Sequence, residues 1–144
     1  MWQSLVAVAG TLAGVLLTSL IQRTERTAAT REARRREALT AVSDLGTALA
    51  DHRQAMWARE DLRLKGGNWA EARAASHTTR SAITAPSVRV ALLLPALTAA
   101  ADTAARATYD MRHAPDQAAL ETARTKALTA ATQFTIEAGR LLAA

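Results

Sequence analysis

The chain contains no cysteine and few aromatic residues, glycines or prolines. Without cysteine it can form neither a disulfide framework nor a thiolate zinc site, and it has no cysteine nucleophile. Aromatic residues make up 3% of the 144 residues and are spread apart, so no stacking surface for nucleic-acid bases is expected. Six glycines and three prolines are too few for a loop-rich fold, whereas alanine, leucine, arginine and glutamate favour helices. The composition therefore predicts an all-α fold of closely packed helices.

Charge is absent from the first 22 residues, and positions 5–21 are almost wholly apolar. A helix that crosses a hydrocarbon layer of ~30 Å needs about 20 residues, which Trp2 to Gln22 supply. Positive charge follows this run instead of preceding it, which favours a membrane anchor over a signal peptide. The positive-inside rule then places the N-terminus outside and residues 23–144 in the cytoplasm, as a single-pass protein of the cell membrane. The alternative is a buried helix of a soluble bundle.

Small residues recur every fourth position within this apolar segment, at Gly10, Gly14 and Thr18. Such spacing lets two membrane helices approach closely, so that dispersion forces and weak contacts hold them together. The segment therefore predicts a homo-oligomer. The alternative is that these glycines only reflect the composition of membrane helices.

Arginine is concentrated directly after the apolar segment, where residues 23–36 carry a net charge of +4 out of +5 for the whole chain. The arginines of this tract are Arg23, Arg26, Arg31, Arg34, Arg35 and Arg36. They could contact anionic lipid headgroups or the phosphates of DNA. Their position beside the anchor favours lipid, and we do not expect direct contact with nucleic acid.

The rest of the chain reads as helices separated by short turns. Residues 23–64 contain no break apart from Gly46, and Gly66-Gly67 ends that helix. Further helices are predicted from 69 to 94, with a kink or break at Pro86, from 96 to 113, and from 117 to 142. One stripe expected to be buried is Leu39, Val42, Leu45, Leu49, His52, Met56 and Arg59. A second is Leu120, Ala127, Ala131, Phe134, Ala138 and Leu141.

We therefore predict an anchor (1–22), a basic juxtamembrane helix (23–38) and a cytoplasmic bundle (39–144). Short turns make neighbouring helices antiparallel, which predicts an elongated three-helix, coiled-coil-like bundle whose middle arm is residues 69–113. Whether residues 69–112 form one kinked helix or two stays open.

Polar side chains at the middle of this bundle are the candidate site. Folding about Gly66-Gly67 brings residues near 52 opposite residues near 77. The candidates for a polar core or a partner contact are His52, Arg53, Trp57, His77 and Arg80. No two histidines share a helix face, so no metal site is predicted. Glu60-Asp61 is interpreted as a solvated helix end, and no catalytic motif is present. We expect neither enzymatic activity nor a cofactor.

Three segments and the anchor together carry a family resemblance. The segments are HRQAMWAREDLRL at 52–64, HTTRSAITAPSV at 77–88 and ATYDMRHAPD at 107–116. With GTLAG at 10–14 and the arginine tract, they resemble the KilB-like membrane proteins of Streptomyces conjugative plasmids and their chromosomal relatives. The strong preference for arginine over lysine is typical of a high-GC genome such as that of an actinomycete.

This resemblance implies a membrane-located accessory protein that acts in plasmid spread along the recipient mycelium after DNA transfer. The resulting expectation is an oligomeric membrane scaffold that contacts plasmid-transfer proteins. Two alternatives remain: a toxin-like or regulatory protein that perturbs the bilayer, and a DNA-binding helical bundle.

Overall fold

The computed structural model describes residues 2–143, with side chains from residue 27 onward, and every regular element among them is a helix. The helices are α1 (Trp2–Leu64), α2 (Ala70–Ala82), α3 (Thr84–Leu93), the 3-10 helix η1 (Pro95–Leu97), α4 (Thr98–Tyr109) and α5 (Gln117–Ala143). The predicted all-α class is therefore confirmed. The chain divides into two compact units, Met1–Arg36 and Glu37–Ala144, and the second unit contains the helical bundle.

The predicted membrane anchor and its small-residue face lie outside the described side chains. Gly10, Gly14, Thr18, Arg23 and Arg26 all belong to this part. Among the helices that the described side chains form, none has a stretch long and apolar enough to cross a membrane.

Each helix of the second unit ends where the sequence supplies a physical reason. Gly66 has a φ of +70°, a left-handed conformation that suits glycine, and it ends α1. The Asn68 side chain then accepts a hydrogen bond from the amide of Ala70, the first residue of α2, at 3.2 Å. α2 ends at Ala82, four residues before Pro86. Proline lacks an amide proton, and its ring clashes with the carbonyl of the residue four positions earlier, so the helix does not continue unbroken. Residues 69–112 thus form α2, α3, η1 and α4.

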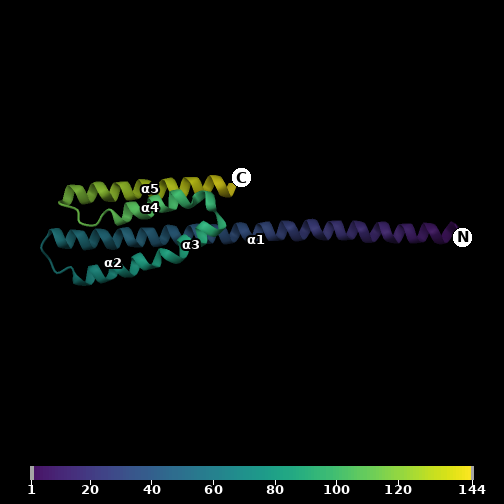
Figure 1. The fold of residues 1–144 in the computed structure, drawn as a ribbon, viewed down its shortest axis with the longest axis horizontal. Coiled ribbons are helices and arrows are strands. Elements are labelled where there is room, and N and C mark those ends of the chain that lie inside the picture. Colours follow the sequence, from purple (N-terminus) through teal and green to yellow (C-terminus); the bar gives the residue numbers. More distant parts are fainter. Residues whose placement is uncertain (1, 144) are drawn as a thin grey trace. The chain divides into compact units, whose positions relative to one another are not determined.

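The second unit is an up-down-up-down arrangement of four arms, which are the end of α1, then α2 with α3, then α4, and then α5 (Figure 1). Asp44 pairs with Arg89 and Arg59 bonds Ser76, so α2 and α3 run antiparallel to α1. In the third arm, the α4 residue Tyr109 lies against His52. The chain has already reversed at Leu94-Pro95, which makes α4 parallel to the end of α1, and α5 reverses again (Figure 1).

The prediction of three arms was wrong. It treated residues 69–113 as one kinked arm, whereas α3 and α4 form a hairpin. Leu94 adopts φ −135° and ψ 68°, outside the helical region, as expected for a residue that precedes proline. Pro95 then starts η1 at a position where its missing amide proton costs nothing.

Two apolar clusters form the core. The larger contains Leu45, Leu49, Val90, Leu97 and Phe134, together with Ile83 and several alanines. The smaller contains Met56, Met111, Ala114, Leu120 and Ala127. Both predicted stripes are buried over most of their length. Each prediction is wrong at one end of its stripe, however, since Leu39 is 50% exposed and Leu141 is 39% exposed.

Candidate functional site

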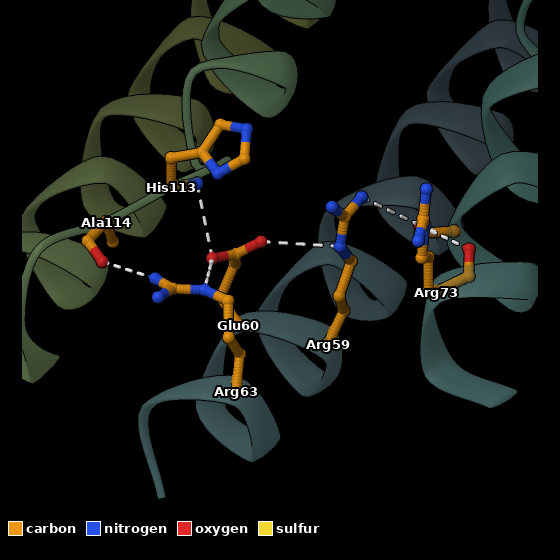
Figure 2. A network of polar contacts seen from close by, with 7 residues as sticks. Arg59, Glu60, Arg63, Arg73, His113 and Ala114 are labelled. Atoms are coloured by element: carbon orange, nitrogen blue, oxygen red, sulfur yellow. Dashed lines mark hydrogen bonds and ion pairs between the residues drawn. The ribbon is translucent and has the colours of Figure 1, made fainter. Parts of the chain in front are cut away.

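A buried carboxylate, Glu60, joins the end of α1 to the turn between α4 and α5 (Figure 2). Its Oε2 lies 2.6 Å from Nε of Arg63 and accepts a hydrogen bond from the backbone amide of His113 at 3.2 Å. Arg63 in turn donates to the carbonyl of Ala114. His113 has a φ of 62°, so this turn is held in a conformation uncommon for a residue with a side chain.

The interpretation of Glu60-Asp61 as a solvated helix end was wrong. Glu60 has no exposed surface and Asp61 is buried as well. The Glu60 carboxylate faces the turn after α4, which is distant in sequence. Asp61 pairs with Lys65 at 2.7 Å, one helical turn further on.

Arg59 is the second buried charge of this region, with 4% of its side chain exposed. Its Nη1 donates to Oγ of Ser76 at 3.3 Å, and that hydroxyl donates to the carbonyl of Arg73 (Figure 2). Its Nε lies 3.4 Å from Oε1 of Glu60, close enough for an ion pair but without the geometry of a hydrogen bond. The guanidinium also lies 5.4 Å from the ring centre of Trp69. Arg59 therefore connects α1 to α2.

His52 lies two helical turns before Arg59 on α1. Its Nδ1 is 3.0 Å from Oγ1 of Thr79, and its ring meets Tyr109 edge to face at 5.5 Å. The guanidinium of Arg80 covers the same tyrosine, 4.4 Å from the centre of its ring. Burial lowers the pKa of His52 to about 4, and the positive charges of Arg80 and Arg59 add to this effect. The imidazole is therefore neutral at pH 7.

These side chains surround a small cavity of about 20 Å³ between α1, α2 and the end of α4. Its lining residues are His52, Met56, Arg59, Ser76, His77, Arg80, Tyr109 and Arg112. Three of the five sequence candidates, His52, His77 and Arg80, thus meet at one place. Among the described residues that line the cavity there is no carboxylate.

The other two candidates, Arg53 and Trp57, lie on a different face of α1, toward α5. The indole Nε1 of Trp57 donates to Glu121 at 2.9 Å, and Arg124 lies 5.7 Å from the centre of the indole ring. Burial lowers the pKa of Arg53 from its ordinary value, and the charge of Arg124 lowers it further. The five candidates therefore divide between two separate places.

Comparison with known proteins settles the family. A family model described as KilB plasmid transfer protein matches residues 39–142. The chain belongs to the KilB plasmid transfer protein family. It is 52% identical to Protein KilB of Streptomyces lividans over 142 residues, which cover 95% of each chain. The resemblance seen in the sequence is thereby confirmed. No solved structure is significantly similar.

The KilB family match contains the whole helical bundle, including the Glu60 network and the cavity beside His52. The arginine tract lies before the matched range. Of its members, Arg31, Arg34, Arg35 and Arg36 have exposed side chains, and Arg36 pairs with Glu32 at 3.0 Å.

Sequence reasoning missed three residues of this region of the KilB-family bundle: Glu60, Tyr109 and Arg112. Arg59 was placed on the buried stripe of α1, and an arginine at such a position already signals a polar contact inside the bundle. Arg112 offered no comparable signal, because its neighbours come from α1 and α2 and depend on the reversal at Pro95.

Proposed function

We propose that this protein is a membrane-anchored helical scaffold that acts in the spread of a conjugative plasmid within the recipient mycelium. The observation that carries the proposal is the KilB family match, which spans the complete four-arm bundle. Residues 1–22 anchor the chain, Gly10 and Gly14 bring copies together, and the bundle contacts other plasmid-transfer proteins. We assign anionic headgroups as the contact of the arginine tract, in which the side chains of Arg31, Arg34, Arg35 and Arg36 are exposed.

Exposed apolar side chains on α3 support a protein contact. Val88 and Leu92 lie one helical turn apart and are 54% and 71% exposed. Apolar side chains that share one exposed stripe favour contact with another protein, whereas single exposed ones are ordinary. We assign this stripe to a protein of the plasmid-transfer apparatus.

Complementation of plasmid spread tests the proposal. A conjugative plasmid that lacks its own KilB-like gene is supplied with this protein in an actinomycete host, and transfer frequency and pock diameter are scored separately. We expect a larger pock diameter at unchanged transfer frequency. Unchanged pocks despite good expression in the membrane fraction would refute a role in spread.

Variants of the stripe test the contact itself. V88Q/L92Q should reduce pock diameter while the helical content of the protein stays the same, because glutamine is also a good helix former. L128Q is the matched control, since Leu128 is an exposed leucine of α5 outside the stripe. Equal loss of spread in L128Q would show that the effect is not specific to α3.

Exchange of the anchor separates a scaffold from a protein that perturbs the bilayer. A scaffold should keep its activity when residues 1–22 are replaced by an unrelated oligomerising membrane helix. G10I/G14I in the native anchor should reduce crosslinking between copies and pock diameter together. Loss of activity with every foreign anchor would favour the toxin-like alternative.

A further inference from the structure

The cavity between α1, α2 and α4 carries an excess of positive charge. Three guanidinium groups, those of Arg59, Arg80 and Arg112, belong to its lining. The carboxylate of Glu60 ion-pairs with Arg59 and is also held by Arg63 and the amide of His113. One carboxylate is therefore shared by two arginines, and the positive charges of Arg80 and Arg112 add to this excess.

The electrostatics of the buried groups agree with this excess. Burial lowers the pKa of Arg59, Glu60 opposes that change, and the charges of Arg112, Arg73 and Arg63 lower the pKa further. Positive charge from two arginines likewise disfavours protonation of His52. An anion among these groups would offset the repulsion between the arginines. The effect is larger here than in water, because the local dielectric constant is lower.

The arginines of this cavity have more donors than their contacts within the bundle use. The guanidinium of Arg59 has five N–H donors, of which Nη1 bonds Ser76 and Nε faces Glu60. Arg80 contacts the face of Tyr109, a geometry that leaves its N–H groups at the rim free to bond outward. Arg80 and Arg112 have exposed side chains, so the cavity is reached from solvent past them.

We propose that this cavity binds a phosphate group, with Arg59 at its base and Arg80 and Arg112 at its mouth. A volume of about 20 Å³ accommodates one water-sized atom, such as a single phosphate oxygen. The remaining oxygens lie toward Arg80 and Arg112, whose forked donors match a tetrahedral oxyanion. His77 on α2 supplies a further polar group. The site is independent of the proposed scaffold role.

Thermal unfolding of the full chain in detergent, followed by circular dichroism, tests this site. Inorganic phosphate is added at constant ionic strength, balanced with chloride, and the midpoint temperature is recorded. A ligand that binds only the folded state raises this midpoint as its concentration increases. Glycerol 3-phosphate is titrated in parallel: binding of both identifies a phosphate monoester, as in the headgroup of phosphatidic acid, and binding of inorganic phosphate alone identifies the free ion.

Two double variants that remove the same charge at different places decide whether phosphate binds at the cavity. R80Q/R112Q should weaken phosphate binding about tenfold or more, since two charge-assisted contacts are lost. R106Q/R140Q removes two exposed arginines elsewhere and should bind like the native chain. R112Q alone leaves the contact between Arg80 and Tyr109 in place, and should weaken binding even if the double variant unfolds.

The imidazole of His52 offers a second measurement at the site itself. Saturating phosphate should raise the pKa of His52, measured by NMR, because an adjacent anion favours the protonated ring. The proposal is overturned if phosphate changes neither the midpoint nor this pKa beyond chloride. It is equally overturned if R80Q/R112Q and R106Q/R140Q respond alike.

Discussion

At the scale of single residues, the stability of the bundle depends on buried charges that are held by partners from distant parts of the chain. Glu60 contacts Arg59 and Arg63 on its own helix and the amide of His113 on the turn before α5. A buried ion pair adds little net stability when compared with an apolar pair, but removal of one partner leaves an uncompensated charge. Glu60 is therefore a position where a small change has a large effect.

We predict that E60A lowers the free energy of unfolding by about 3–5 kcal/mol, because it leaves Arg59 buried without its carboxylate. Urea denaturation followed by circular dichroism measures the change. E37A is the control, since Glu37 is an exposed glutamate on the same helix, and it should stay within about 0.5 kcal/mol of the native chain. Similar losses in the two variants would contradict the role of the network.

His52 predicts a pH dependence of stability. Its pKa is about 4 in the folded chain against 6.5 for an ordinary histidine, so the unfolded state binds more protons between these values. Stability contributed by the neutral imidazole is complete above pH 6.5 and falls by up to about 3 kcal/mol as the pH drops to about 4.

Comparison with H52Q isolates this contribution from that of the carboxylates. Stability of the native chain should decline more steeply than that of H52Q between pH 6.5 and 4, whereas H77Q, which replaces an exposed histidine, should follow the native chain. Parallel curves for the native chain and H52Q would show that His52 is not protected from protonation.

At the scale of helices, glycines within and after α1 have opposite roles. Gly66 adopts a positive φ at the end of the helix, whereas Gly46 lies inside it, and apart from the neighbouring backbone of its own helix no atom lies within 4 Å of the position that a Cβ would take. G66A should therefore destabilise the protein by about 1 kcal/mol, and G46A should stabilise it by about 0.5–1 kcal/mol. Thermal unfolding measures both, and a shift of the same sign would contradict this assignment.

Helix ends in this chain follow from local chemistry. Pro86 and Pro95 restrict the backbone through their rings, whereas Gly66, without a Cβ, permits the left-handed conformation, and the structure has a helix boundary within a few residues of each. At the start of α5, the Asp116 carboxylate caps the helix, because it accepts a hydrogen bond from the amide of Ala119 at 2.7 Å.

At the scale of the molecule, both apolar clusters lie within residues 37–144. A fragment of these residues therefore contains the whole described core. We predict that it folds alone and unfolds cooperatively, as circular dichroism and denaturant titration can show. F134A in this fragment should cost about 3–5 kcal/mol, because the buried ring fills the larger cluster. A gradual transition without a baseline would contradict an independent fold.

The helical class, the turns and most of the two buried stripes could be predicted from the sequence, because propensity, proline geometry and hydrophobic period act over a few residues. The same reasoning placed His52 opposite His77, since both are a short distance from the same turn. Only the packed structure revealed that α3 and α4 form a hairpin, so that the bundle has four arms. It also revealed that Glu60 is buried and that Arg112 joins Arg59 and Arg80. Burial and charge grouping depend on which helices become neighbours, and that choice comes from packing over the whole chain.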